Sequence, residues 1–337
     1  MSLFPTRRKF LQMGAAGAAV GALAVAGDGT IFAANRPQLV SIEVPLPRLA
    51  ETWDSFRIVQ LSDFHYDDFF SAVPLRKAID IVNQLQPDLV VLTGDFVTSP
   101  VNDTHRGSAR RAARRIEPCS QLLAQIRARS AILAVLGNHD LDTDAAHITA
   151  VLQSHAIPVL RNRSVSVERE GKRLWLSGVD DVLAGKPDLG LALKGVPPDE
   201  PVILLAHEPD WADYVAHHPV DLQLSGHSHG GQVRFPLVGP VYLPKLGRKY
   251  VWGLRRIGPL MLYTNAGIGT VRVPIRLNCP PEVTLITLRA GSGGAPRSKS
   301  EAGVGVSVHA TYPSDSSVTR DSISLSPVGS SSRCSML

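Results

Sequence analysis

The hydrophobic positions of this chain fall into short runs that end in polar residues. The run Phe56–His65 predicts a buried strand that passes into a loop at Ser62. Apolar residues recur at helical spacing over Leu75–Leu85, and Pro87 ends that helix. Pro87–Asp95 is a second short apolar run, and it ends in Gly-Asp. This order predicts a strand-helix-strand unit with parallel strands, whose carboxyl ends are the usual place for a ligand.

The rest of the chain continues this pattern and then becomes rich in strands. A second helix is expected over Arg106–Arg129, followed by a third apolar run, Ala131–Asp140. Gln38–Val44 alternates like an edge strand that Pro45 and Pro47 end. Further strands are expected at Val165–Glu168, Arg173–Val179, Val202–His207, Val220–Gly226, Met261–Asn265 and Val283–Leu288. Residues 36–290 are therefore expected to form one α/β domain of two packed sheets with helices outside.

Residues 1–35 are predicted to be a signal peptide and linker. A basic cluster, Arg7–Lys9, precedes an apolar, Gly/Ala-rich run, Met13–Ala26, that is short for a membrane span. The stretch Thr6–Leu11 resembles a twin-arginine signal, with Gln12 where a lysine is common. We expect the twin-arginine machinery to export the chain to the periplasm or the outer face of the cytoplasmic membrane. An uncleaved N-terminal membrane helix is the alternative.

Residues 291–337 are rich in Ser and Gly, lack a periodic apolar face and are predicted to be a disordered tail. The last four residues, Cys334–Leu337, match a prenylation box, which we attribute to chance in a chain with this type of leader. The three cysteines, Cys119, Cys279 and Cys334, form no CxxC pair. Neither a disulfide framework nor structural zinc is therefore expected.

The charge of the chain adds little to this picture. A net charge of +5 and a pI near 9.2 weakly favour a phosphorylated substrate or an anionic membrane surface, and no nucleic-acid partner is expected. On the second predicted helix, Arg110 with Arg114 and Arg111 with Arg115 form a basic stripe. A solvated helix face is the preferred interpretation of this stripe, and peripheral docking on anionic lipid is the alternative.

Five apolar runs end in residue types that bind metal ions. The endings are Asp63-Phe64-His65, Gly94-Asp95, Gly137-Asn138-His139-Asp140, Ala206-His207-Glu208 and Gly226-His227-Ser228-His229. Side chains at i and i+2 of an extended segment face the same side, so His227 and His229 point toward one place. The flanking glycines allow turns and the close approach of a ligand. A flexible surface loop would explain one such ending, but five in one chain indicate a metal site.

This series, D-x-H, G-D, G-N-H-D, H and G-H-x-H, resembles the calcineurin-like metallophosphoesterase superfamily from about Phe56 to Leu288. The resemblance implies a four-layer α-β-β-α sandwich of two mixed sheets. The stretch GHSHGGQVRFP, together with the leader, is similar to an exported or membrane-associated bacterial phosphodiesterase branch. Some relatives in that branch cleave the pyrophosphate of UDP-2,3-diacylglucosamine in lipid A synthesis. The expected substrate is therefore a phosphorylated small molecule, nucleotide-linked or lipid-linked.

The resemblance also implies a site with two divalent metal ions. The residues that match the ligands of one ion are Asp63, His65 and His229, and those that match the ligands of the other are Asn138, His207 and His227. Asp95 matches the carboxylate that bridges both ions. Ligands of this kind without thiolate suit Mn, Fe, Zn, Co or Ni, and the sequence leaves the choice among these metals open.

The implied reaction is hydrolysis of a phosphoester. The ions lower the pKa of water, so that a hydroxide attacks phosphorus in line near neutral pH. His139 matches the family's general acid, which protonates the leaving alkoxide, and an outer structural histidine is the alternative for this residue. Departures from related families narrow the activity. No Asp-Arg-Gly element follows Asp95, Thr98 stands where purple acid phosphatases have a tyrosine ligand, and Ala266 stands where related phosphodiesterases often carry a basic residue.

The expected function is a dinuclear metal-dependent phosphodiesterase or pyrophosphatase. Two alternatives stay open, which are a phosphomonoesterase or nucleotidase and a catalytically inactive metal-binding protein. The proline-rich segment Phe235–Leu254 is expected to be a loop beside the metals. It is either a plain connection or a grip on a phosphate or lipid head group.

Overall fold

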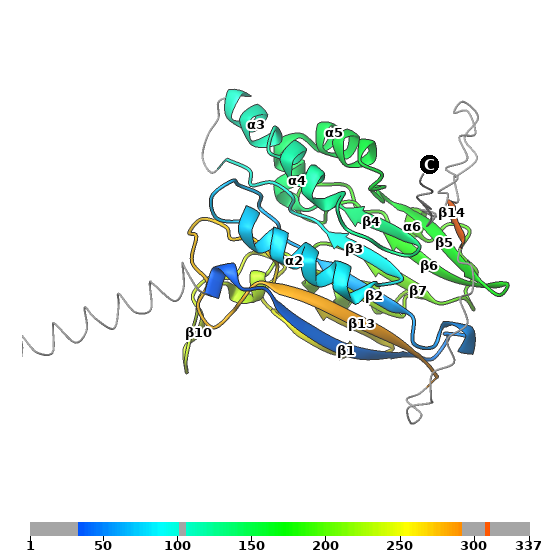
Figure 1. Ribbon diagram of the computed structural model, residues 1–337. Helices are drawn as coiled ribbons and strands as arrows, with labels where there is room; N and C mark the ends of the chain where they lie inside the picture. Colours follow the sequence, from blue (N-terminus) through cyan, green and yellow to red (C-terminus); the bar gives the residue numbers. More distant parts are fainter. Residues whose placement is uncertain (1–32, 101–105, 292–306, 311–337) are drawn as a thin grey trace, which may run out of the picture.

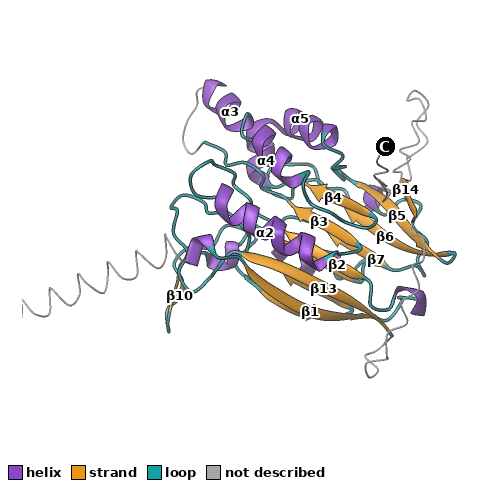
Figure 2. Ribbon diagram, viewed as in Figure 1, coloured by secondary structure: helices purple, strands orange, loops and turns teal. Residues whose placement is uncertain are grey.

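The computed structural model describes residues 33–100, 106–291 and 307–310 of the 337-residue chain (Figure 1). The predicted signal lies outside these ranges up to residue 32, and so do tail residues 292–306 and 311–337. Two large β-sheets form the body, and helices lie on their outer sides (Figure 2). None of the described helices is both long and apolar enough to span a bilayer.

The first large sheet has five strands and contains the predicted strand-helix-strand unit. In spatial order its strands are β1 (Gln38–Leu46), β13 (Glu282–Ala290), β2 (Arg57–Leu61), β3 (Leu89–Thr93) and β4 (Ala131–Val135). The neighbours β2, β3 and β4 are parallel. β13 runs antiparallel to β2 and parallel to the edge strand β1, so the sheet is mixed.

The second large sheet has seven strands. In spatial order they are β11 (Gly253–Ile257), β12 (Leu260–Thr264), β8 (Leu222–Ser225), β7 (Val202–Leu205), β6 (Lys172–Gly178), β5 (Arg163–Arg169) and β14 (Ser307–Ala310). The four strands from β12 to β6 are parallel, and the three remaining pairings, at the two sides, are antiparallel. Separately, β9 (Arg234–Phe235) and β10 (Gly239–Pro240) form a small antiparallel pair.

The helices form the two outer layers. On the side of the first sheet lie α2 (Ala72–Leu85), α3 (Arg106–Ala113), α4 (Ile116–Leu123) and α5 (Asn138–Ser154). On the side of the second sheet lie α6 (Leu189–Ala192) and α7 (Ala212–Val215). Single turns of 3-10 helix are η2 (Ala33–Asn35), η3 (Glu51–Trp53), η4 (Pro209–Trp211) and η5 (His229–Gly231).

Alternate side chains of the central strands enter different hydrophobic cores, as expected for strands that are buried on both faces. In β3, Val90 and Leu92 pack among the helices, whereas Leu89 and Val91 pack between the two sheets. In β7, Leu204 packs in a third core with α6 and α7. Three cores between four layers confirm the predicted α-β-β-α sandwich.

The carboxyl ends of central strands from both sheets meet at one edge of the molecule. Gln60 of β2 donates from Nε2 to Oγ1 of Thr93 at 3.0 Å and to the carbonyl of Ser225, at the end of β8, at 2.9 Å. One step further, the backbone N–H of His227 donates to Oδ1 of Asp63 at 2.9 Å. Loops of both sheets therefore contribute to one common site.

The prediction of a single helix over Arg106–Arg129 is wrong. Two helices, Arg106–Ala113 and Ile116–Leu123, take its place. Pro118 is the third residue of the second helix and has no N–H to donate to the carbonyl of Arg114. A continuous helix would be broken at this point, so a new one begins instead.

Other segments also differ from expectation. β1 continues through Pro45 to Leu46, because an edge strand tolerates a residue without an N–H on its unpaired side. Within the tail that was expected to be disordered, Ser307–Ala310 forms β14 and pairs with β5, whose edge would otherwise be free. Helix α5, which begins at Asn138 within the Gly137–Asp140 ending, and strand β11 have no counterpart among the expected elements.

Candidate metal centre

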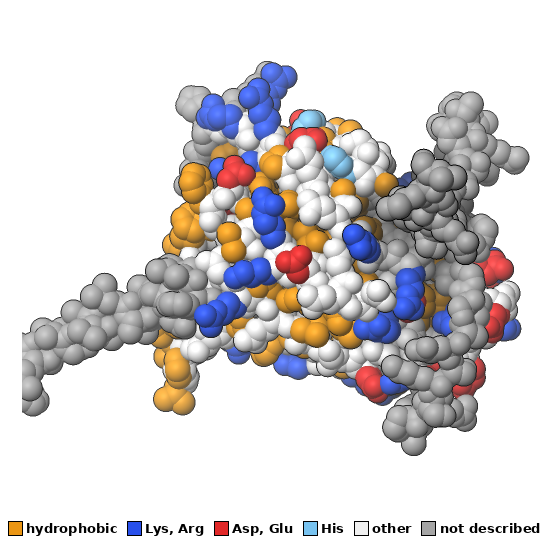
Figure 3. Space-filling model, in the orientation of Figure 1, with side chains coloured by type: hydrophobic (Ala, Val, Ile, Leu, Met, Phe, Trp, Pro, Cys, Tyr) orange, Lys and Arg blue, Asp and Glu red, His pale blue; other side chains and the backbone are white. Residues whose placement is uncertain are grey.

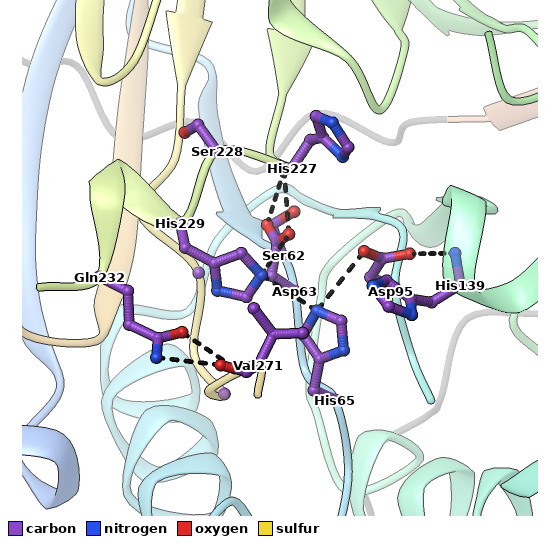
Figure 4. Close-up of polar contacts among 12 residues, drawn as sticks. Ser62, Asp63, His65, Asp95, His139, His227, Ser228, His229, Gln232 and Val271 are labelled. Carbon is purple, nitrogen blue, oxygen red and sulfur yellow. Dashed lines mark hydrogen bonds and ion pairs between the residues drawn. The ribbon is translucent and has the colours of Figure 1, made fainter. Parts of the chain in front are cut away.

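Four buried side chains from the loops after β2, β3 and β8 converge on one point. They are Asp63, His65, Asp95 and His229, and their donor atoms all lie within 4.8 Å of one another. Nε2 of His65 lies 3.0 Å from Nε2 of His229 and 3.4 Å from Oδ2 of Asp95. Nε2 of His229 lies 3.3 Å from Oδ1 of Asp63. Figure 4 shows these rings and carboxylates turned toward one another.

A second group shares Asp95 with the first. It consists of Asp95, His207 and His227, all buried and again with donor atoms within 4.8 Å of one another. Nε2 of His207 lies 3.1 Å from Oδ2 of Asp95. The carboxylate of Asp95 therefore belongs to both groups of potential ligands and lies where the two groups meet.

Asn138 and His139 complete the rim of this site at the start of α5. Oδ1 of Asn138 is buried and has no hydrogen-bond partner in the described part of the chain. The backbone N–H of His139 donates to Oδ1 of Asp95 at 3.0 Å (Figure 4). The ring of His139 stands edge-on to the ring of His65, with 4.8 Å between the ring centres. All eight residues singled out from the sequence thus lie in one place.

Five of these residues have backbone conformations that side chains rarely adopt. The φ angles are 51° at Asp63, 40° at His65, 57° at Asp95, 67° at His227 and 53° at His229. A positive φ costs a non-glycine residue free energy, and such residues persist only where the surrounding structure holds them. The bonds from Asp63 N to the carbonyl of residue 94 and from His65 N to the carbonyl of Asp95, at 3.0 and 2.9 Å, provide part of that hold.

Two glycines keep space open for the carboxylates. A Cβ at Gly226 would overlap Oγ of Ser62 and Oδ2 of Asp63. A Cβ at Gly137 would overlap Oδ1 of Asp95. The glycines in the sequence endings are therefore required because backbone from neighbouring loops lies directly against the acidic side chains.

Hydrogen bonds to the far side of three imidazoles leave one nitrogen of each ring facing the site. Nδ1 of His207 lies 2.6 Å from the carbonyl of Thr93, and Nε2 of His227 lies 2.8 Å from the carbonyl of Lys245. A carbonyl can only accept, so these nitrogens donate, and the opposite nitrogen keeps its lone pair when the ring is neutral. Nδ1 of His65 lies 3.1 Å from Oγ1 of Thr98 in the same way.

Burial disfavours the charged forms of the carboxylates and imidazoles in this site, and the charges of their neighbours outweigh this effect only at some of them. Burial raises the pKa of Asp63 to about 6 and lowers the pKa of His65 to about 3 and that of His227 to about 4. Burial is the largest influence on Asp95 and opposes its ionisation, but the neighbouring histidines, His207 first among them, together hold the pKa of Asp95 well below its ordinary value. Burial also opposes the charged form of His207, but Asp95, Asp63 and Glu208 together raise the pKa of His207 well above its ordinary value.

These features fit divalent cations. Donor atoms separated by 3.0 to 3.4 Å in the first group match the edges of a tetrahedron or octahedron. Such edges measure about 3.0 to 3.4 Å when ligands lie about 2.0 to 2.1 Å from a metal. Carboxylate oxygens and neutral imidazole nitrogens are suitable donors. The buried Oδ1 of Asn138, whose residue lies in the chain between Gly137 and His139, has no hydrogen-bond partner among the described residues.

Some residues that shape the site were not assigned a role from the sequence. Ser99 contacts Nδ1 of His139 through its backbone N–H at 3.0 Å and its hydroxyl at 2.7 Å. The buried carboxylate of Asp140 accepts from the backbone N–H groups of Phe96 and Val97 and, through its other oxygen, from that of Gly137. Asp140 therefore ties the Gly-Asp loop to the next loop. Its place in the Gly-Asn-His-Asp ending was the signal available in the sequence.

Arg276 is a second such residue, and its side chain is completely buried. Its guanidinium donates to the carbonyls of Ala266, Gly269 and Cys279 at 2.6 to 3.1 Å. The N–H of Gly269 in turn donates to the carbonyl of Asp63 at 2.7 Å. Arg276 thus holds the loop that packs behind Asp63, and nothing in the sequence distinguishes this arginine from exposed ones.

Comparison with known proteins places this geometry in context. A family model described as calcineurin-like phosphoesterase matches residues 56–231. The chain is 32% identical over 293 residues to the Bacillus subtilis protein named uncharacterized metallophosphoesterase YkuE, across 85% of this chain and 98% of that protein. It is 32% identical over 289 residues to Escherichia coli phosphodiesterase YaeI, across 84% of this chain and 99% of that protein. A Danio rerio transmembrane protein with a metallophosphoesterase domain is 32% identical over 275 residues, across 77% of this chain and 59% of that protein.

Proposed function

Because the chain belongs to the calcineurin-like phosphoesterase family, we propose that this metal-dependent phosphoester hydrolase is a two-metal phosphodiesterase that cleaves a phosphodiester or pyrophosphate bond. The observation that carries the proposal is the shared position of Asp95 between the two ligand groups. A carboxylate in that position screens the repulsion between two cations held a few ångströms apart.

Each residue of the centre has a proposed part in this reaction. One cation would be held by Asp63, His65 and His229, a second by Asn138, His207 and His227, and Asp95 would contact both. Divalent cations at such sites supply Lewis acidity and a water of lowered pKa. The chain's own contribution is to hold the donors rigidly. Buried loops, positive φ angles and the hydrogen bonds that His207 and His227 donate to backbone carbonyls fix the ligands before substrate arrives.

His139 is proposed to give a proton to the leaving oxygen. Nδ1 of His139 accepts from the N–H of Ser99 when the ring is neutral, so the proton lies on Nε2. The backbone of His139 is fixed on Asp95, and its ring stands beside His65. This arrangement supports a proton donor at the border of the metal site, close to the proposed position of the leaving oxygen.

The preference for a diester is proposed on two grounds. The relative from Escherichia coli, similar along nearly its whole length, is named a phosphodiesterase. The segment after His229 also lacks acidic residues as far as Pro281, which suits a substrate with negative charges on both sides of the scissile bond. We propose a nucleotide-linked or lipid-linked substrate, with UDP-2,3-diacylglucosamine as one compound to test.

The proposal is tested by hydrolysis of bis(p-nitrophenyl) phosphate and p-nitrophenyl phosphate with Mn(II), Fe(II), Zn(II), Co(II) or Ni(II). We expect metal-dependent turnover with a higher kcat/KM for the diester, and a measurable fall in rate in His139→Ala. His147→Ala is the matched control, because His147 is an exposed histidine of the same helix. Preference for the monoester would favour a phosphomonoesterase, and absence of turnover with every metal would overturn the proposal.

Export is a further part of the proposed function. The twin-arginine-like leader supports a periplasmic location or one on the outer face of the cytoplasmic membrane. A double substitution, Arg7→Lys with Arg8→Lys, is expected to retain the chain in the cytoplasm, as measured by cell fractionation. Equal export of the double variant and the unchanged chain would contradict the assignment.

A further inference from the structure

A hairpin with an apolar tip extends from the loop that follows His229. Residues 234–241, which we call the apolar hairpin, contain β9 and β10 and a turn between them. The fractional exposure is 108% at Leu237, 79% at Val238 and 64% at Val241. In Figure 3, orange side chains cover the protrusion at the lower left, where Figure 1 labels β10. Large aliphatic side chains clustered and exposed in this way mark a binding surface.

The apolar hairpin is held outward by its base. Gln232 donates from Nε2 to the carbonyls of Val271 and Val273, and its Oε1 accepts from the N–H of Val271. The N–H of Arg234 donates to the carbonyl of Leu277 at 3.0 Å. These bonds fix the start of the hairpin's first strand to the body, and the N–H of Val241 in the second strand donates to the carbonyl of Val233. The tip is therefore exposed rather than packed in one of the apolar cores.

The segment that contains the base of the apolar hairpin is rich in basic residues. Between Leu222 and Pro281 the sequence has eight Lys and Arg residues and no Asp or Glu. Arg234 lies over the ring of Trp252 and Arg272 over the ring of Tyr242, with 5.4 and 4.3 Å to the ring centres. Several basic side chains of this region are not buried and have no carboxylate partner among the described residues. They include Arg234, Lys245, Arg248 and Arg272, which we call the basic collar.

An apolar tip with a basic collar and interfacial aromatic rings matches the chemistry of an anionic bilayer surface. Aliphatic side chains enter the acyl region, tryptophan and tyrosine rings suit the level of the head groups, and cations attract anionic lipids. A small convex tip fits a bilayer better than a protein partner, because stable protein interfaces bury larger and flatter areas. The charge and the shape of the apolar hairpin therefore point to the same partner.

The first described residues of the chain lie close to the apolar hairpin. The described structure begins at Ala33, and β1 follows at Gln38. Gln38 lines one cavity together with Arg234 and Trp252. The described chain therefore begins, at η2, on the same side of the molecule as β10 and the apolar hairpin (Figure 1).

One residue of the basic collar, Lys245, also contacts the metal centre. The carbonyl of Lys245 accepts the bond from Nε2 of His227 at 2.8 Å, and Gln232 is three residues beyond His229. Any surface that contacts the apolar hairpin therefore lies beside the ligand loops. A substrate carried in that surface would reach the site without leaving it.

We propose that the apolar hairpin inserts its tip into an anionic lipid bilayer and holds the metal centre against the head groups. The substrate class would then be a phosphodiester or pyrophosphate carried by a membrane lipid, a part of the proposal that rests on the proposed function. Membrane docking itself does not depend on that function, because it follows from exposure, charge and position alone.

The docking is tested on the full chain with a probe at the tip. An environment-sensitive fluorophore is attached to Val238→Cys in a Cys334→Ser background, since Cys119 and Cys279 are buried. Vesicles contain phosphatidylglycerol mixed with phosphatidylcholine and a lipid that carries a nitroxide quencher. We expect quenching at position 238 and none in the matched control Leu191→Cys, which labels an exposed leucine of α6. Pure phosphatidylcholine and added salt should weaken the effect.

A second measurement separates docking from catalysis. The double variant Leu237→Glu with Val238→Glu is expected to lower hydrolysis of a vesicle-borne phosphodiester by about tenfold or more. Its rate on soluble bis(p-nitrophenyl) phosphate should equal that of the unchanged chain, and Leu191→Glu should alter neither rate. Failure of the unchanged chain on the soluble diester would count against the proposed function, while the quenching result would still decide docking.

Two results would overturn the docking proposal. One is an unquenched probe at position 238 while the chain sediments with the vesicles, since the leader alone would then account for binding. The other is burial of the probe in solution without vesicles, accompanied by a dimer in analytical ultracentrifugation. That outcome would identify a second copy of the chain as the partner of the apolar hairpin.

Discussion

Ser99 and His139 are joined through two atoms of the serine. The backbone nitrogen and the hydroxyl oxygen of Ser99 lie 3.0 and 2.7 Å from Nδ1 of His139. The backbone N–H can only donate, so in the neutral ring it selects the tautomer with the proton on Nε2. Ser99 is therefore a positioning residue for the proposed proton donor.

Ser99→Ala keeps the backbone donor and removes the hydroxyl. We expect kcat to fall by about three- to tenfold, because the ring is held less firmly, with KM and metal content unchanged. Ser99→Thr, which returns a hydroxyl, should restore kcat. If kcat of Ser99→Ala stays as in the unchanged chain, the hydroxyl does not position the ring.

The effect of His139→Ala should depend on the leaving group. A poor leaving group such as an alkoxide requires a proton, so kcat should fall by about a hundredfold or more. A nitrophenolate leaves readily without a proton, so the loss on the nitrophenyl diester should be smaller than on an alkyl diester. Rates measured over a series of leaving groups check this, and a loss of equal size across the series would assign His139 a purely structural part.

Asp95→Asn should affect both proposed metal positions, whereas Asn138→Ala should affect one. The carboxylate of Asp95 is common to both ligand groups. Asn138 is proposed as a ligand of the second cation alone. Asparagine has no negative charge to screen two cations, so the second cation to bind should be lost first. Elemental analysis of protein prepared with excess Mn(II) measures the metal content. Equal metal content in the Asp95→Asn variant and the unchanged chain would contradict the bridging position.

Gly226→Ala should damage the centre through the acidic side chain. The new Cβ would overlap Ser62 and Asp63, both in a closely packed loop. We expect the free energy of unfolding to fall by about 1 to 3 kcal/mol and metal binding to weaken. Gly190→Ala is the control, since its Cβ would lie 3.4 Å from Oδ1 of Asp188, an ordinary contact. Urea unfolding compares the two, and a Gly226→Ala chain as stable as the control would show that the loop yields easily.

Arg276→Ala should cost stability. Removal of the guanidinium leaves the carbonyls of Ala266, Gly269 and Cys279 buried without their donor. We expect a loss of about 3 kcal/mol or more in the free energy of unfolding, measured in urea. Arg255→Ala, at an exposed arginine of β11, should lie within about 0.5 kcal/mol of the unchanged chain. A small effect at position 276 would mean that water replaces the lost bonds.

Much of the fold and the site could be predicted from the sequence because both leave short-range signals. Apolar runs with polar endings predicted the strands and the edge at which Asp63, Asp95 and His227 meet. Long-range contacts leave no such signal. Arg272 is exposed and Arg276 is completely buried four residues later in the same proline-containing segment, and only the packing of three loops decides between them.

The same limit applies to the segment after His229. Its prolines and glycines predicted a loop, whereas the outward direction of Leu237 follows from bonds that Gln232 makes to residues about forty positions further along the chain. Helix α5 was missed for a related reason. Its first turn carries the proposed ligand Asn138 and the proposed proton donor His139, so its residue types reflect that chemistry rather than helix propensity.

The closure of the apolar hairpin at its base has an evolutionary consequence. Because Gln232 and Lys245 are secured on either side of it, the residues between them can change in length and composition while the histidines stay in register. The catalytic chemistry and the choice of surface can therefore diverge independently. A descendant of this chain could acquire a new target by altering a dozen residues, without rebuilding the machinery that breaks the bond.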